Sequence, residues 1–302
     1  MFNHISETIK SIADFVCGYP LFFWLIGGGL FLFIYSGAIP LRRFKWSLKA
    51  LRAKNNSGEG EISSFQALMS SICSTVGMGN IAGVAIAISI GGPGAIFWMW
   101  LMAVLGSASA FIESTLAQIY KKKEGDSFKG GPAYYIERAL HARWLGIIFA
   151  ISLIATFAFG FNGLQAYNIV SAFAVYTTDI EASILPTVIG LLLAIAALYI
   201  FFAGDVIGKI SSVLVPTMAG LYIAVGIFVI ITNITKIPGV LAIVMQDAFN
   251  FKSIFGGFTG SCMVYGIKRG LFSNEAGMGS APNASASAEV SHPAKQGLAQ
   301  II

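Results

Sequence analysis

Apolar residues gather in seven stretches along the chain, separated by short polar segments. Each stretch approaches or exceeds the roughly 20 apolar residues that a helix needs to cross a bilayer. The pattern therefore predicts seven membrane-spanning helices, with an eighth apolar segment beginning after His292. The predicted spans are 21–39, 65–90, 95–119, 144–176, 185–203, 206–232 and 240–267.

The second stretch is interrupted in its middle by Thr-Val-Gly-Met-Gly-Asn at 75–80. Glycines are poor helix formers, so the helix is expected to open there. Unwound backbone at membrane depth is tolerated only where protein or a water-filled cavity satisfies its polar groups. Many ion-coupled transporters hold their solute at such a break. The interruption predicts a binding site at mid-membrane.

A second interruption is predicted within 240–267, where Phe-Gly-Gly-Phe-Thr-Gly-Ser occupies 255–261. This span comes five spans after 65–90 and would run in the opposite direction. Five-plus-five inverted repeats place two broken helices in that relation, facing each other. The alternative is that the glycines only permit close helix packing, as small residues often do in membranes. Two interruptions at this spacing favour transport.

Lysine and arginine orient the predicted spans, since they concentrate in cytoplasmic loops. Two basic loops flank the second and third spans, so both loops are expected to be cytoplasmic and the N-terminus outside. They hold Arg42, Arg43, Lys45, Lys49, Arg52 and Lys54, and Lys121, Lys122, Lys123, Lys129, Arg138 and Arg143. Treating 144–176 as one long, tilted helix keeps Lys209, Lys268 and Arg269 on the same side.

Composition supports a membrane protein. The 302 residues are 56% hydrophobic and 11% charged, whereas a soluble domain carries about 25% charged residues. The net charge of +5 reflects the topology of the chain in the membrane rather than nucleic-acid binding, because the basic residues lie in short loops beside the spans. The apolar segment 21–39 is long enough to span, and we interpret it as a helix rather than a signal peptide.

Two other classes of function lack their signatures. The three histidines, His4, His141 and His292, are far apart, and no G-x-S-x-G motif occurs, which argues against an enzyme. Neither symmetric filter segments nor charged rings of a channel are present. The cysteines Cys17 and Cys262, together with Cys73, form no CxxC pair and are expected to be packing residues.

Four motifs resemble the alanine or glycine:cation symporter family, the sodium-dependent alanine and glycine carriers. They are SSFQALMSSICSTVGMGNIAGVA (63–85), GGPGAIFWMW (91–100), GGPAYYI (130–136) and RGLFSNEAGMGSAPNASA (269–286), with GDVIGKISSVLVPTMA (204–219) as a weaker fifth. The resemblance implies an all-α membrane protein with a leucine-transporter-like core of two inverted five-helix repeats. One extra N-terminal helix precedes that core.

On this resemblance the chain is one transporter domain, 1–302. The extra helix occupies 20–40, the first repeat 63–233 and part of the second repeat 238–302. Family members continue through the rest of the second repeat, so the chain is interpreted as C-terminally truncated relative to them. An inactive fragment or a split-gene portion is the alternative to a working carrier.

An amino-acid substrate needs partners for its carboxylate, its ammonium group and its side chain. The amides around Gly77, Met78 and Gly79 are expected to bind the carboxylate, helped by the following half-helix. The remaining expected substrate contacts come from both breaks and from the span between them: Thr75, Phe161, Gln165, Gly257, Phe258 and Thr259. Gln165 is the candidate for the ammonium group, and the two phenylalanines for a small side-chain pocket.

Sodium, a hard cation, prefers oxygen ligands. The candidates are the Asn80 side chain, the carbonyls of Cys73, Thr75 and Val76, and Thr259 across the site. Sodium is the expected coupling ion, with no other cofactor. Sodium would order the opened helix and the amino acid would bind beside it, before the protein alternates between two openings in the inner membrane.

Three further residues are candidates for gating or coupling. Glu113 is an acidic residue within a span, and such acids are often functional. Snorkelling or a pair with Lys121 is the alternative explanation. Asn274 and Glu275 belong to a stretch expected to begin on the cytoplasmic side, as a gate or helix cap rather than a ligand site.

Overall fold

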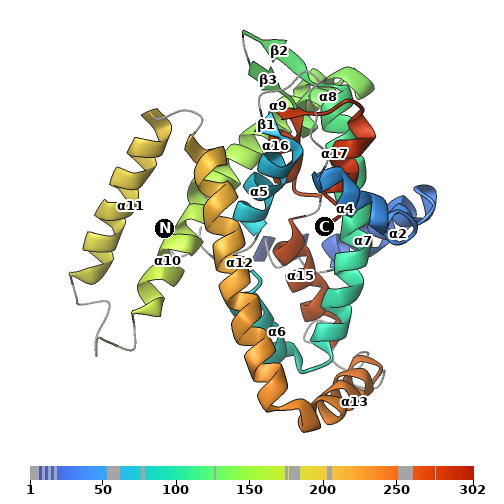
Figure 1. Cartoon of the computed structure of the whole chain (residues 1–302), viewed down its shortest axis with the longest axis vertical. Coiled ribbons are helices and arrows are strands. Elements are labelled where there is room, and N and C mark those ends of the chain that lie inside the picture. The colour runs from blue at the N-terminus through green and yellow to red at the C-terminus, as the bar shows by residue number, and fades with distance from the viewer. Residues whose placement is uncertain are drawn as a thin grey trace.

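The computed structural model describes residues 7–8, 11–12, 15–16, 19–52, 62–75, 79–125, 127–173, 176, 184–202, 206–250, 261–275 and 277–302. This part of the chain is mostly helical (Figure 1). Among the described residues, four helices are long and apolar enough to cross a membrane: Ala95–Ile119, Arg143–Ala172, Leu185–Phe202 and Ile210–Thr232. The prediction of an all-α, multi-pass membrane protein is confirmed.

Three predicted spans agree closely with helices α7 (Ala95–Ile119), α11 (Leu185–Phe202) and α12 (Val206–Thr232). The predicted span 144–176 forms one helix over Arg143–Ala172, since α9 (Arg143–Ala155) continues into α10 (Asn162–Ala172). The two are joined by the π-helical turn η1 (Thr156–Phe161). Such π segments are rare and often lie at functional sites.

The first predicted span forms α2 (Tyr19–Tyr35), which packs against α7. Gly29 permits this contact, because a Cβ there would lie 3.4 Å from the Cβ of Leu105. The chain reverses at Gly37 and Ala38, both with positive φ, and continues into α3 (Ile39–Arg42) and α4 (Phe44–Arg52).

The interruption predicted in the second span is confirmed. Helix α5 (Ser64–Thr75) ends there, Gly79–Ile81 form a turn, and α6 (Ala82–Gly91) begins after it. Residues 76–78 lie outside the described part of the chain. The span is therefore two half-helices rather than one helix.

The predicted span 240–267 does not have those bounds. Helix α13 (Ile237–Ala248) follows the 3-10 turn η2 (Ile234–Lys236) and lies across the end of α12 at one extremity of the molecule (Figure 1). Helix α15 (Cys262–Asn274) starts afresh and extends seven residues beyond the predicted end. The prediction joined two separate helices into one span. It did so because α13 is apolar, although it does not form a membrane-spanning helix with α15.

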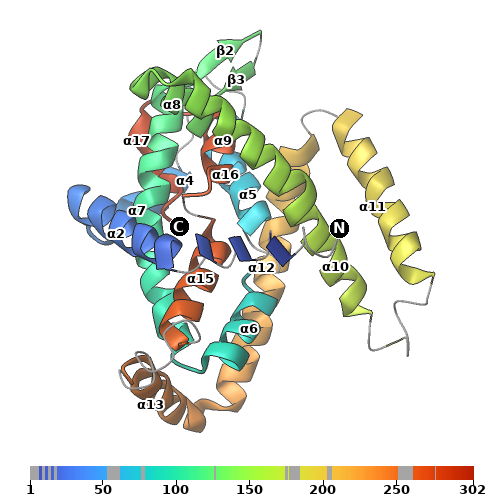
Figure 2. The same cartoon turned by 180° about the vertical axis from the view of Figure 1, so that it is seen from behind.

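A second pair of half-helices is formed by α15 and α16 (Ser280–Ala286), separated by residues 275–279. Helix α6 packs against α15, and α5 packs against α16. The two interrupted helices therefore lie side by side and run in opposite directions (Figures 1 and 2).

The start of α5 and the end of α16 are tied together toward the extremity of the molecule opposite α13 (Figure 1). Strand β1 (Ile62–Ser63), before α5, pairs in parallel with β4 (Ala288–Glu289), after α16. The hairpin β2 (Lys122–Glu124) and β3 (Ser127–Lys129) lies near them, with α8 (Pro132–Leu140) and α17 (Pro293–Ala299) (Figure 2).

Helix α7 is the central support, since it contacts α15, α16, α17 and α2. Glycines on α15 permit the close approach. A Cβ on Gly270 would lie 2.9 Å from the Cβ of Met102, and one on Gly266 would lie 2.7 Å from the Cβ of Trp98. Small residues at such spacing are the usual device for packing membrane helices.

Candidate functional site where the interrupted helices meet

The two interruptions touch through backbone. Gly79, in the turn before α6, is buried, and a Cβ there would lie 3.1 Å from Cα of Ser273 at the end of α15. The same Cβ would lie 3.4 Å from the ring of Phe272. A side chain at position 79 would therefore force the interrupted helices apart.

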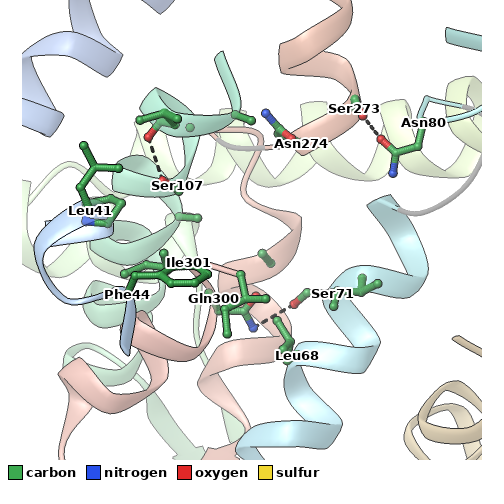
Figure 3. A pocket seen from close by; sticks show the side chains of 18 residues that line it. Leu41, Phe44, Leu68, Ser71, Asn80, Ser107, Ser273, Asn274, Gln300 and Ile301 are labelled. Carbon is green, nitrogen blue, oxygen red and sulfur yellow. Dashed lines mark hydrogen bonds between the residues drawn. The ribbon is translucent and has the colours of Figure 1, made fainter. Parts of the chain in front are cut away.

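A side-chain hydrogen bond joins the same two segments. The hydroxyl of Ser273, which is 8% exposed, donates to Oδ1 of Asn80 (Figure 3). Both groups also have oxygen lone pairs that suit a hard cation. The structure thus brings the predicted sodium ligand Asn80 beside a hydroxyl that the sequence did not single out.

Phe161 reaches this junction from the π-helical turn. Its ring stacks on Phe272 with centroids 5.4 Å apart, and on Phe157 with centroids 4.7 Å apart. Phe272 is the neighbour of Ser273 and lies next to Gly79. The predicted pocket residue Phe161 is therefore brought to the junction of the two breaks.

The predicted amide ligand Gln165 is exposed and lies one helical turn after Phe161. Residues four apart share a helix face, so Gln165 lies on the face from which Phe161 reaches Phe272. Asn162 is exposed, and its Nδ2 lies 3.4 Å from the carbonyl of Ala158 in its own helix.

A cavity of about 440 Å³ opens beside the junction. This volume is within the range of roughly 300–1,000 Å³ that small-molecule sites occupy. Figure 3 shows Ser273 and Asn80 turned toward each other, and Gln300 turned toward Ser71. The polar residues that line the cavity are Ser71, Asn80, Ser107, Ser273, Asn274 and Gln300.

Glu275 shapes the second interruption. It ends α15 in the left-handed conformation, with φ of 48°, and its amide donates to the carbonyl of Leu271. Its carboxylate, in a side chain only 3% exposed, accepts a 2.6 Å hydrogen bond from the hydroxyl of Ser280. Glu275 thus ends α15, and its bond to Ser280 also fixes the start of α16.

Glu113 contacts the same interruption from α7. Its carboxylate accepts a hydrogen bond from the amide of Gly277, which has φ of 85°. Lys121 was the alternative partner predicted for Glu113. Its Nζ lies 4.4 Å from the ring centroid of Phe128.

Tyr135 on α8 lies near the Glu113 carboxylate. Burial raises the pKa of Tyr135 well above its ordinary value, and the nearby carboxylate adds to that shift.

Gln118 is a site residue that the sequence reading missed. It is buried on α7, and its Nε2 donates to the carbonyls of Ser285 and, over 2.8 Å, Ala288. The Ser285 carbonyl lies at the end of α16, where a helix leaves acceptors unsatisfied, and Ala288 begins β4. Gln118 therefore holds the second half-helix against α7.

Several predicted residues lie outside the described part of the chain. They are Val76, Gly77, Met78, Gly257, Phe258 and Thr259. Cys73 and Thr75 lie in the last turn of α5, and only their backbone is described. Their carbonyls belong to the C-terminal end of a half-helix, which carries partial negative charge.

The sequence does contain a signal for the second interruption. Gly-Met-Gly occurs at 77–79 and again at 277–279, each time followed by a small polar residue, Asn80 or Ser280. Gly277 and Gly279 both adopt positive φ. This internal repeat was not used in predicting the breaks.

Comparison with known proteins identifies relatives along the whole chain. The model of the sodium:alanine symporter family matches residues 2–302. The chain is 47% identical to the amino-acid carrier protein AlsT of Bacillus subtilis, an alignment that covers 100% of this chain and 64% of that protein.

Two further relatives carry more specific names. The probable sodium/glutamine symporter GlnT of Bacillus subtilis is 44% identical over 99% of this chain and 62% of its own length. The sodium/alanine symporter AgcS of Methanococcus maripaludis is 37% identical over 97% of this chain and 65% of its own length. The chain thus spans a little under two thirds of each of these relatives.

Proposed function

The chain belongs to the sodium:alanine symporter family, and we propose that it carries a small neutral amino acid across the membrane together with Na⁺. The observation that supports this most is the pairing of two interrupted helices, with Asn80 hydrogen bonded to Ser273 where they meet. Opened helices at mid-membrane expose the backbone groups that hold anionic and cationic groups.

We interpret the paired helices as parts of a leucine-transporter-like inverted repeat. Its first repeat would occupy 63–233 and its second would begin at 238, after an extra helix at 20–40. The opposite directions of α5–α6 and α15–α16 support this assignment. We place the second break at 275–279, where α15 ends, whereas the break predicted at 255–261 lies, apart from Ser261, outside the described residues.

The substrate carboxylate would lie at the N-terminal end of α6, against the amides of Gly77, Met78 and Gly79. A helix N-terminus has free amides and partial positive charge, so no arginine is needed. Gln165 would accept the ammonium group. Phe161, with Phe272, would close a pocket that fits only a small side chain.

Sodium would bind at the other side of the break, where α5 ends. The proposed ligands are the Asn80 side chain and the carbonyls of Cys73, Thr75 and Val76. Carbonyl and amide oxygens suit a hard cation, and the partial negative charge of the helix end favours it. Sodium bound there would hold Asn80 in place for the amino acid.

The second interruption would act as the gate on the side of α16. Glu113 binds Gly277 from α7, and Glu275 binds Ser280 within the loop. Asn274 lines the cavity beside them. Breaking these contacts would free α16 to move against α7, which is the motion that alternating access needs.

We place the protein in the inner membrane with its N-terminus outside. The hairpin β2–β3 supports this orientation, because it carries Lys122, Lys123 and Lys129 and lies at one extremity of the molecule (Figure 1). Basic loops are retained on the cytoplasmic side.

Uptake by liposomes that contain the purified protein tests the coupling. An inward sodium gradient should accumulate labelled alanine or glycine above its external concentration, and an equal choline gradient should not. Liposomes without protein are the control. Alanine uptake that is indifferent to the sodium gradient would contradict the proposal.

Glutamine is the second candidate substrate, because the 44% identity to a probable sodium/glutamine symporter favours it. A pocket bounded by Phe161 and Phe272 favours alanine instead. Competition distinguishes them: excess unlabelled alanine should abolish labelled alanine uptake, whereas the same excess of glutamine should leave most of it.

A further inference from the structure

A second cavity, of about 420 Å³, lies between α3, α4, α7 and α17, and none of its lining residues lines the cavity beside the junction of the interrupted helices. Apolar side chains form one part of its lining, namely Ile39, Phe111 and Leu298. The other part is cationic, since Arg42 and Arg43 also line it. The cavity therefore combines an apolar wall with positively charged residues.

The two arginines are available for an anion. Both are exposed, and within the described part of the chain neither takes part in an ion pair. The reversal at Gly37 brings Arg42 back toward α2, where its Nη1 lies 3.5 Å from the carbonyl of Gly37. Guanidinium groups bind phosphate in a bidentate manner, and two adjacent groups strengthen that preference.

Helix α4 adds Trp46, a residue type common at the membrane interface, to the lining of this cavity. Ser47 and Ala50 are buried on its inner side, which leaves Trp46 half-exposed in the cavity lining. Nζ of Lys49 lies 5.0 Å from the Trp46 ring centroid. Tryptophan beside lysine is typical of the level of the lipid headgroups.

We propose that this cavity binds one anionic phospholipid of the cytoplasmic leaflet. The phosphate would lie against Arg42 and Arg43, Trp46 would border the glycerol region, and an acyl chain would cover Phe111 and Leu298. Basic pockets between membrane helices on the cytoplasmic side recognise anionic headgroups in this way. The assignment of this end to the cytoplasm rests on the proposed topology.

The cavity fits a lipid better than a free phosphate ion. A phosphate ion would satisfy the guanidinium groups but leave the apolar wall of Ile39, Phe111 and Leu298 exposed. An acyl chain removes that wall from water, which is favourable in proportion to its area. The combination of charge and apolar surface is therefore specific to an anionic amphiphile.

Native mass spectrometry of the purified protein in detergent tests this proposal. The protein is mixed with equal amounts of phosphatidylglycerol and phosphatidylethanolamine, and the retained lipid is identified. The wild type should retain phosphatidylglycerol in preference. Arg42→Gln with Arg43→Gln should lower that retention about tenfold, as loss of two cations near a headgroup predicts.

Two further variants separate a pocket from general surface charge. Lys122→Gln with Lys123→Gln removes the same charge from strand β2 and should leave phosphatidylglycerol retention unchanged. Ala294→Phe, at a residue that lines the cavity, keeps the charge and should lower retention by filling the space. Circular dichroism checks that each variant is folded.

Three results would overturn the proposal. They are equal retention of both lipids by the wild type, unchanged retention by the arginine variant, and displacement of the lipid by millimolar inorganic phosphate. The measurement involves no transport. Failure of sodium-driven uptake would therefore leave the lipid result standing, and failure of lipid binding would leave the proposed transport untouched.

Discussion

Gly79 shows at the scale of a single residue why the first interruption needs glycine. The sequence suggested that glycine opens the helix there, because it is a poor helix former. In the structure the missing side chain admits the backbone of Ser273, 3.1 Å from where a Cβ would lie. The glycine thus sets the separation of the two interrupted helices.

Gly79→Ala should therefore destabilise the protein. The added methyl group meets backbone that has little freedom to move, and overpacking of this kind costs about 1–3 kcal/mol. We expect a lower midpoint of thermal unfolding for the purified protein. Gly226→Ala on α12 is the matched control, because a Cβ there has no atom within 4 Å. Equal midpoints for Gly79→Ala and wild type would contradict this account.

Individual site residues were predictable where the chemistry is local. The glycines and Asn80 could be predicted, because poor helix formers interrupt an otherwise apolar, helix-forming segment. Ser273 and Gln118 did not, because their partners are 193 and 170 residues away in sequence. Nothing in an apolar helix distinguishes a serine that bonds across the fold from one that bonds its own turn.

At the scale of elements, α13 is fastened to the corner between α6 and α7. Oδ2 of Asp247 accepts a 2.7 Å hydrogen bond from the amide of Gly94, which caps α7. Nε1 of Trp98 donates to the carbonyl of Ala248 over 3.2 Å. A Cβ on Gly94 would overlap the backbone of Ala248. Gly92 and Gly94 thus permit α13 to dock.

Asp247→Ala should weaken this docking. It removes a charge-assisted bond to a helix N-terminus, which costs about 1–2 kcal/mol. The unfolding midpoint should fall, and protease cleavage within α13 should be faster. Met245→Ala, at an exposed position on the same helix, should change neither. If the two variants behave alike, Asp247 does not fasten α13.

The apolar pattern predicted most helices but misjudged one connection. Helices α7, α11 and α12 have almost the predicted bounds because each is continuous and apolar throughout. The segment 240–267 is also apolar, yet its first part turns aside as α13. Hydropathy reports how apolar a segment is and carries no information on its direction.

At the scale of the whole molecule, the interrupted helices are the part most deeply enclosed by others. Helices α10, α11 and α12 expose large apolar side chains along their length, as surfaces that face lipid do. By contrast α15 is enclosed by α6 and α7. The junction at Gly79 and Ser273 thus lies within protein rather than at the lipid surface, which opened backbone in a membrane requires.

The central claim is that the junction of the interrupted helices binds an amino acid together with sodium. Binding of labelled alanine to the purified protein, measured in sodium chloride and in choline chloride, tests it most directly. Asn80→Ala removes a proposed sodium ligand and should raise the sodium concentration for half-maximal binding about tenfold or more, as loss of a hydrogen-bonding group to a charge predicts.

Ser89→Ala is the control, since that hydroxyl bonds its own helix α6 at the carbonyl of Ile86. We expect the wild type and Ser89→Ala to bind alanine only in sodium, with the same sodium concentration for half-maximal binding. For Asn80→Ala alone, that concentration should be higher. Equal alanine binding in sodium and in choline would contradict it.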